Sequence, residues 1–171
     1  MKKEKSIEKR YSFKDFLPLI IIGLLVVACA LVRQFFLPAF DMYAFMNDFM
    51  GAFFIIFGLF KIMNLKGFAE AYSTYDIIAK RSAVYALIYP FLEIVLGVFY
   101  IMRWYPPFTN LVTLILMLVS AVGVAQNLAK REPIMCACLG TVFKIPMTYV
   151  TLVEDLLMAL MAIINLIMLY T

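Results

Sequence analysis

Two cysteines separated by a single residue are the most distinctive chemical feature of this sequence. Cys136 and Cys138 lie in the run Met135–Cys136–Ala137–Cys138–Leu139–Gly140. Thiols at this spacing can close a small, strained disulfide that exchanges readily with other thiols. The same pair can bind a soft metal ion such as Cu(I) or Hg(II), with Met135 and Met147 adding thioether ligands. We predict that Cys136 and Cys138 are a catalytic redox pair, with soft-metal binding as the alternative reading.

A plain structural role for the thiols stays open as well. A free cysteine often packs as a small hydrophobic residue, so the pair can simply occupy the end of a helix. The sequence has three Cys and no His. A single chain of this composition cannot supply the four ligands of a closed zinc site. The residues identify no cofactor.

Polar residues within long apolar segments form a second candidate feature. Such residues are costly in a membrane and usually face the interior of a helix bundle. Glu93 is expected near the midplane of its span. Lys61 can pair with Glu93 or Glu154, although for Lys61 taken alone we expect the side chain to snorkel to the interface. We predict a proton-handling or structural polar seam made of Glu93, Pro90, Lys61, Glu154 and Asn127.

Three helix faces are expected to supply this seam. Residues three, four or seven positions apart share a face of a helix. The first face holds Ala86, Pro90, Glu93, Gly97 and Tyr100. The second holds Thr113, Ser120 and Asn127, with Gly123 beside them. The third holds Glu154, Met158, Met161 and Asn165, with Asp155 on a neighbouring face.

The amino-acid composition indicates whether these elements fold in water or in a lipid bilayer. Of 171 residues, 65% are hydrophobic and 15% are charged, and the mean hydropathy is +0.97. Soluble domains have roughly 45–50% apolar and about 25% charged residues. The chain is therefore predicted to lie in a lipid bilayer. A nucleic-acid partner is not expected, because the formal charge of +4 sits in clusters that flank apolar segments.

The predicted fold is an all-α, polytopic membrane helix bundle with a four-helix core and one additional N-terminal transmembrane helix. A basic cytoplasmic arm, residues 1–16, precedes a single transmembrane domain, residues 17–171. Gly51 and Gly58 share a face on which a neighbouring helix can approach closely. The polar stretch 64–82 is read as a connection. The five spans are expected at about 17–37, 43–63, 84–104, 108–129 and 152–170.

The distribution of Lys and Arg predicts the orientation. Alternate loops hold 13 and 2 of the 15 basic residues, and the richer side is normally cytoplasmic. We therefore predict a multi-pass protein of the bacterial inner membrane, with a cytoplasmic N-terminus and an extracytoplasmic C-terminus. The loop 130–149 contains a ten-residue apolar run, 134–143, that is too short to cross. It is expected to be interfacial or re-entrant on the cytoplasmic side.

Three stretches in order resemble the MauE/DoxX-like redox-associated membrane proteins, named for a methylamine utilisation protein. The resemblance covers the chain from about Phe49 to its C-terminus. Ala137 and Leu139 depart from the family's usual C-G-C-F-G. The stretches are Gly58–Leu59–Phe60–Lys61 followed by Phe68 and Tyr75, then Pro90–Phe91–Leu92–Glu93 with Gly97, then Cys136–Ala137–Cys138–Leu139–Gly140.

The resemblance implies a compact four-helix bundle that forms or maintains disulfides in exported proteins, together with a thioredoxin-like partner. By position, Cys136 and Cys138 would be the redox pair, and Pro90 and Glu93 the core motif. The charge count places the pair on the cytoplasmic side, whereas disulfides form outside. Either reducing equivalents pass outward, or the loop re-enters deeply, or the redox reading fails. A scaffold subunit without chemistry is the third alternative.

Overall fold

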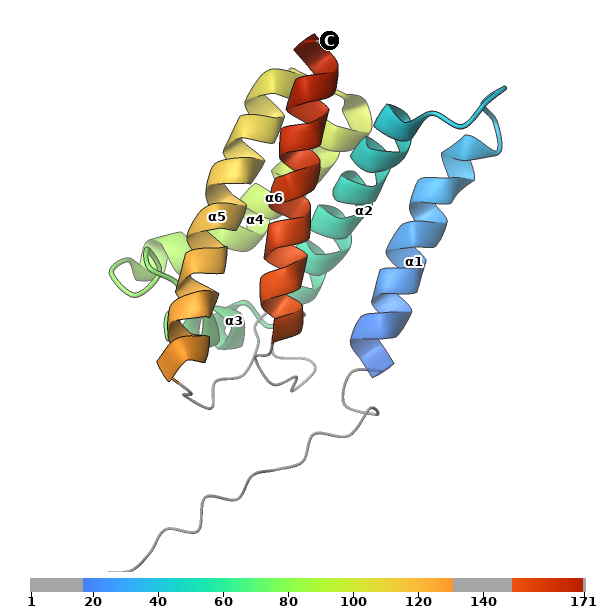
Figure 1. Cartoon of the computed structure of the whole chain (residues 1–171). Helices are drawn as coiled ribbons and strands as arrows, with labels where there is room; N and C mark the ends of the chain where they lie inside the picture. The colour runs from blue at the N-terminus through green and yellow to red at the C-terminus, as the bar shows by residue number, and fades with distance from the viewer. Residues whose placement is uncertain (1–16, 131–148, 171) are drawn as a thin grey trace, which may run out of the picture.

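The computed structural model describes residues 17–130 and 149–170, and all secondary structure within them is helical (Figure 1). Five of the six described helices are long and apolar enough to cross a membrane. The prediction of an all-α, polytopic bundle with five spans is therefore confirmed. The helices are α1 (Leu17–Gln34), α2 (Met42–Met63), α3 (Leu65–Tyr72), α4 (Ala83–Met102), α5 (Pro106–Lys130) and α6 (Tyr149–Tyr170).

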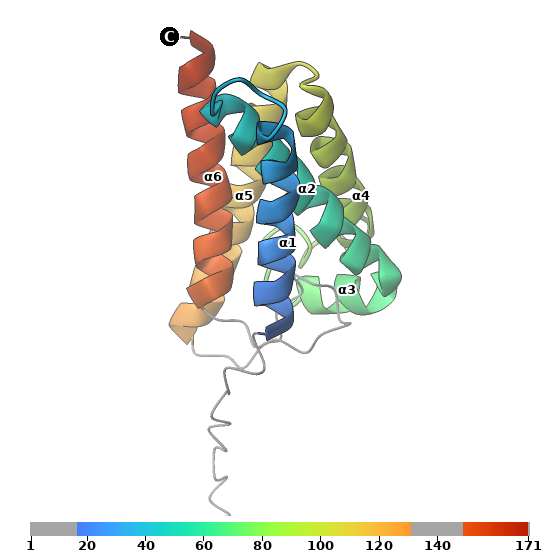
Figure 2. The same ribbon diagram turned by 90° about the vertical axis from the view of Figure 1, so that its right-hand side faces the viewer.

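Four spans pack around a common core, and α1 lies to one side of it (Figures 1 and 2). The largest described core cluster joins α2, α4, α5 and α6 through side chains that include Phe54, Tyr100, Met117 and Met158. By contrast, α1 buries only a narrow stripe of small and branched residues against α2, including Val26. The remaining faces of α1 are open, as expected for a helix in contact with lipid.

Glycines allow α2 and α4 to approach closely. A methyl group added at Gly97 would lie 2.9 Å from the carbonyl oxygen of Gly51, and one added at Gly58 would lie 3.1 Å from that of Pro90. Small residues permit such contact between transmembrane helices. The expected role of Gly51 and Gly58 is therefore observed. This contact sets the crossing of α2 and α4, on which the positions of Lys61 and Glu93 depend.

The polar connection expected between the second and third spans contains a short helix, α3. The Asn64 side chain caps it by accepting a hydrogen bond from the Gly67 N–H at 3.3 Å. Phe68 and Tyr72 are buried, and the Tyr72 ring lies 4.6 Å from the Tyr89 ring of α4. The connection is therefore part of the packed core, which the polarity of the stretch did not indicate.

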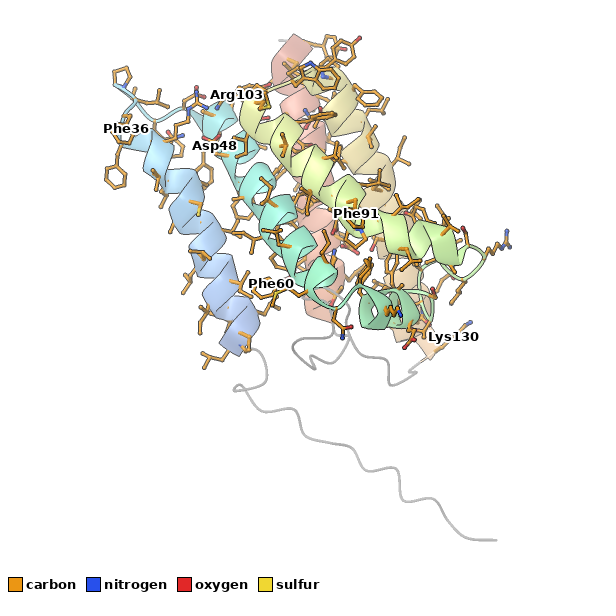
Figure 3. All side chains as sticks on the ribbon, turned by 180° about the vertical axis from the view of Figure 1, so that it is seen from behind. Phe36, Asp48, Phe60, Phe91, Arg103 and Lys130 are labelled. Carbon is orange, nitrogen blue, oxygen red and sulfur yellow. The ribbon has the colours of Figure 1, made fainter. Side chains whose placement is uncertain are left out.

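The connection between α4 and α5 lies at the opposite end of the bundle. Arg103 caps α4 in the left-handed conformation, with φ 52°. Pro106 then begins α5, where its missing N–H costs nothing. Exposed Trp104 and Tyr105 are aromatic residues of the kind found at membrane interfaces. Figure 3 shows Arg103 at this end and Lys130 at the other.

Candidate functional site

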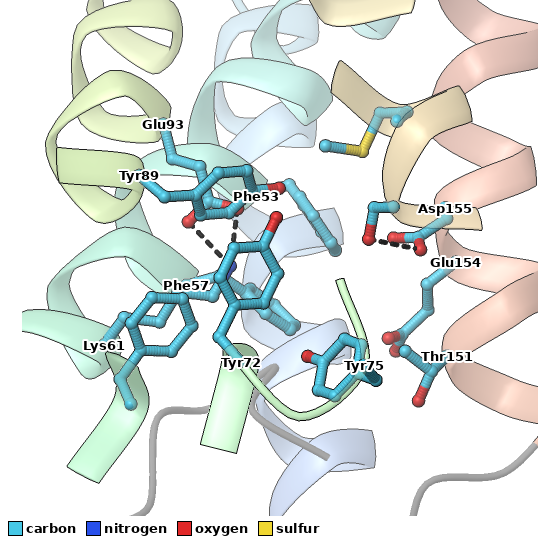
Figure 4. A pocket seen from close by; sticks show the side chains of 13 residues that line it. Phe53, Phe57, Lys61, Tyr72, Tyr75, Tyr89, Glu93, Thr151, Glu154 and Asp155 are labelled. Carbon is cyan, nitrogen blue, oxygen red and sulfur yellow. Dashed lines mark hydrogen bonds and ion pairs between the residues drawn. The ribbon is translucent and has the colours of Figure 1, made fainter. Parts of the chain in front are cut away.

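A small polar cavity lies inside the four-helix core, at the end of the bundle where α3 packs (Figure 4). The space open to the centres of water molecules is about 30 Å³, which is room for about two waters. Six aromatic rings form much of the wall, from Phe53, Phe57, Phe68, Tyr72, Tyr75 and Tyr89. The polar lining comes from Lys61, Glu93, Ser120, Thr151, Glu154 and Asp155.

A buried ion pair joins α2 to α4 on one side of this cavity. The Lys61 Nζ donates to Glu93 Oε1 and Oε2 at 2.5 and 2.6 Å. The two side chains are 9% and 2% exposed. The Lys61 ammonium further lies 5.1 Å from the centroid of the Tyr89 ring, a cation–π distance. Each charge therefore has a partner inside the membrane.

The pairing corrects one expectation about Lys61. Its position near the end of a span favoured snorkelling to the interface, but the side chain points inward and is buried. The physical reason is the partner, because Glu93 offers two oxygens within reach once α2 and α4 are in contact. A buried ion pair of this geometry holds together two charges that would each be costly alone.

The opposite wall of the cavity is acidic. Ser120 Oγ of α5 donates to Asp155 Oδ2 of α6 at 2.8 Å, and Glu154 and Thr151 lie beside them. Among the described residues, three carboxyl groups line the cavity and Lys61 is the one basic side chain. Within the part of the chain that the structure describes, two of these carboxyl groups therefore lack a basic partner. Because uncompensated charge is costly within a bilayer, the cavity is suited to holding exchangeable protons.

Tyr72 brings a hydroxyl from α3, outside the spans, to this cavity. Burial, with smaller contributions from the neighbouring Tyr89 and Tyr85, raises the pKa of Tyr72 well above its usual value. Its hydroxyl therefore stays protonated at neutral pH. Together with Tyr89, it gives the cavity hydrogen-bond donors that carry no charge.

The other residues predicted for the seam have structural positions. Pro90 is buried on the same face of α4 as Glu93, where its carbonyl faces Gly58. The Asn127 side chain donates to the carbonyls of Gly123 and Tyr75 at 2.7 and 3.2 Å. Asn127 thus ties the connection after α3 to α5. Of the five predicted seam residues, the structure brings Lys61, Glu93 and Glu154 together at the cavity.

Sequence reasoning missed the part played by Asp155. It assigned α6 a polar face centred on Glu154, with Asp155 on the next face. The signal was present, because Ser120 had already been placed on a bundle-facing stripe of α5, and a serine hydroxyl in a membrane needs an acceptor. The contact between α5 and α6 turns Asp155 toward that stripe.

The predicted redox pair lies outside the described residues. Cys136 and Cys138 fall in the range 131–148, and so do Met135 and Met147, the additional ligands in the metal alternative. Their roles stay predictions. Within residues 17–130 and 149–170, no group of three or more His, Cys, Asp or Glu side chains is arranged to hold a metal ion.

The fold and the cavity define a polytopic helical membrane protein with a buried ion pair inside a four-helix core. Residues 39–168 match the family model described as methylamine utilisation protein MauE. The chain therefore belongs to the MauE family, and the resemblance inferred from the sequence is confirmed. The matched region holds the four core spans and omits α1. No curated protein and no solved structure matches the chain significantly.

Proposed function

We propose that this MauE-family protein relays thiol and disulfide equivalents through Cys136 and Cys138, in support of disulfide formation or maturation of exported proteins. The supporting observation is the buried Lys61–Glu93 pair, which stands in a cavity with two further carboxyl groups. The end of α5 and the start of α6, which flank the cysteine-containing segment, both lie at the end of the bundle that holds this cavity (Figure 1). The segment that carries the thiols is therefore joined at both of its ends to the part of the bundle that holds the cavity.

The proposed partner is a thioredoxin-like protein with its own thiol pair. A partner thiolate attacks one sulfur of the Cys136–Cys138 disulfide, which breaks that bond and forms a mixed disulfide. The second partner thiolate then attacks the partner's sulfur in the mixed disulfide. The partner leaves as a disulfide, and Cys136 and Cys138 become thiols. Two electrons and two protons pass in this direction, and the reverse sequence oxidises the pair.

Proton transfer is the contribution proposed for the cavity. Each turnover protonates two thiolates or deprotonates two thiols, so a nearby group that exchanges protons speeds the reaction. Glu154 and Asp155 are proposed to exchange these protons. The Lys61–Glu93 pair is proposed to hold α2 and α4 in place around them. We further propose an inner-membrane location with a cytoplasmic N-terminus, which puts this end of the bundle on the cytoplasmic side.

Thiol trapping in intact cells tests the relay. We expect the wild-type pair to cycle between reduced and oxidised forms, and the Cys136→Ser or Cys138→Ser variant to accumulate a mixed disulfide with a partner. Cys29→Ser is the matched control, because Cys29 lies on an exposed face of α1. Labelling with an impermeant thiol reagent from each side of the membrane identifies the compartment in which the pair reacts.

Two outcomes would contradict the relay. If the double Cys136→Ser, Cys138→Ser variant matures exported partners normally, the protein acts as a scaffold. If wild-type protein binds a stoichiometric soft metal ion that Cys136→Ser loses, the thiols are ligands.

The role of the cavity in proton transfer is tested by a separate measurement. Asp155→Asn keeps an acceptor for Ser120, and we expect it to slow exchange with a soluble dithiol and to flatten its pH profile.

A further inference from the structure

A second group of charges lies at the other end of the bundle, about a crevice between α1 and the core. Arg33 lies in the last turn of α1, Asp48 lies in α2 and Arg103 caps α4. Both arginines approach the same oxygen, Asp48 Oδ1, at 3.7 Å from Arg33 Nη1 and 3.6 Å from Arg103 Nη2. Figure 3 shows Asp48 and Arg103 close together at this end. We call this group the arginine cluster.

The arginine cluster carries more positive than negative charge. Two guanidinium groups share one carboxylate. A further carboxylate, Asp41, accepts the Ala44 N–H through its Oδ1 at 3.0 Å at the start of α2, where the positive end of the helix dipole offsets part of its charge. An anion in contact with both guanidinium groups would therefore be attracted to them.

Two buried polar atoms of the arginine cluster also have no hydrogen-bond partner among the described residues. Arg103 Nη2 is buried and has no hydrogen-bond partner among the described residues, and the same holds for Asp48 Oδ2. Buried donors in proteins are nearly always paired, so an unpaired guanidinium N–H indicates an acceptor that the chain itself does not supply. A phosphodiester presents such acceptors to two arginines at once.

The crevice beside the cluster is apolar. Its volume is about 380 Å³, and Arg33 and Asp48 are its charged residues. The other walls are formed by Cys29, Val32, Phe36, Ala52 and Ile101. Arg33 lies one turn closer to the end of α1 than Cys29, so the crevice extends from the charged cluster toward the middle of the membrane. Its shape fits a charged head with an apolar chain attached.

The depth of the cluster matches the headgroup region of a bilayer. Trp104 and Tyr105 follow Arg103 directly and are exposed, and aromatic residues of this kind mark the membrane interface. Phe36 at the end of α1 is exposed as well. Guanidinium groups at this depth are suited to the phosphate of a lipid headgroup.

We propose that the arginine cluster is a binding site for one anionic phospholipid. Its phosphate accepts hydrogen bonds from Arg33 and Arg103, and one acyl chain lies in the crevice between α1, α2 and α4. The apolar walls favour a lipid over free phosphate, because a free anion would leave the crevice without an occupant. This lipid site does not depend on thiol exchange at the opposite end of the bundle.

The test uses the purified full-length protein with phosphatidylglycerol, phosphatidylcholine of the same chains, or glycerol phosphate. Native mass spectrometry measures retained lipid, and thermal unfolding measures stabilisation. We expect phosphatidylglycerol to be retained and to raise the Tm more than the other two. Arg33→Gln and Arg103→Gln should each weaken retention roughly tenfold, the effect of losing one charge-assisted hydrogen bond. Arg81→Gln, an exposed arginine at the other end, should leave retention unchanged.

A second variant covers the case in which an arginine variant fails to fold. Val32 lines the crevice and is itself exposed, so Val32→Trp should fill the crevice and reduce phosphatidylglycerol retention while both arginines remain. Equal retention by wild type, Arg33→Gln and Arg103→Gln would overturn the proposal. So would equal stabilisation by glycerol phosphate, which would show an anion site without a lipid chain.

Discussion

The Lys61–Glu93 pair and the arginine cluster differ in how closely their charges are paired. The Lys61–Glu93 pair is almost fully buried, with nitrogen–oxygen distances of 2.5 and 2.6 Å. In the arginine cluster the nitrogen–oxygen distances are 3.6 and 3.7 Å, and Arg103 and Arg33 are 25% and 45% exposed. The first group has equal numbers of positive and negative charges, whereas the second has an excess of positive charge.

This difference follows from depth in the membrane. Inside the hydrocarbon a charge must find its partner within the protein, because lipid headgroups do not reach it and the cavity has room for only about two waters. At the interface an unmet guanidinium can find a partner outside the chain. The same two helices, α2 and α4, supply Lys61 with Glu93 at one end and Asp48 with Arg103 at the other. We therefore interpret the first group as internal structure and the second as a place for an external ligand.

Removing one partner of the buried pair should give the largest effect. In Glu93→Ala the Lys61 ammonium would stay buried without its carboxylate. Loss of one partner of a buried pair costs about 3–5 kcal/mol. We expect the free energy of unfolding, measured in mixed micelles, to fall by this amount.

The matched control removes both charges. The double variant Lys61→Met, Glu93→Leu should recover most of the stability that Glu93→Ala loses, because apolar replacement of a buried pair is often neutral. A Glu93→Ala protein as stable as wild type would show that Lys61 finds another partner, Glu154 being the nearest predicted one. The Lys61–Glu93 pair would then not be needed as internal structure.

A change in the contact between α2 and α4 should affect both groups. In Gly97→Ala the new methyl group would lie 2.9 Å from the Gly51 carbonyl oxygen and 3.0 Å from the Ile55 nitrogen. Both are backbone atoms, so the helices must separate. Overpacking of this kind typically costs about 1–3 kcal/mol.

Gly23→Ala in α1 is the control for that measurement, because nothing lies within 4 Å of the added methyl group. We expect its free energy of unfolding to stay within about 0.5 kcal/mol of wild type. If the two glycine variants are equally stable, the close contact between α2 and α4 does not determine the positions of the charged groups.

Periodicity predicted the buried faces of α4 and α5 correctly. All five residues of the expected α4 face are buried, from Ala86 to Tyr100, as are Thr113, Ser120 and Asn127 of α5. These faces were predictable because four or five turns of one helix repeat the same pattern. Helix α3 was not predicted, since eight residues give barely two turns and its surroundings are polar.

Pairing between helices was less predictable than the faces themselves. The sequence left Glu93 and Glu154 as alternative partners for Lys61. Only the crossing of α2 and α4, set by backbone contact at the glycines, brings Glu93 within reach. The hydrogen bond from Ser120 to Asp155 likewise depends on the rotation of α6 against α5, which no pattern within one helix encodes. The arginine cluster was missed because its members come from three separate elements.

The smallest effect on stability is expected from Asp48→Asn in the arginine cluster. Both arginines are partly exposed and meet Asp48 at distances too long for a hydrogen bond, so we expect the free energy of unfolding to fall by less than about 1 kcal/mol. Retention of phosphatidylglycerol should increase instead, because the carboxylate that competes with the phosphate has gone. A loss of several kcal/mol, or weaker lipid retention, would mean that Asp48 is a structural partner like Glu93. The two ends of the bundle would then be alike, and the excess positive charge at the interface would need another explanation.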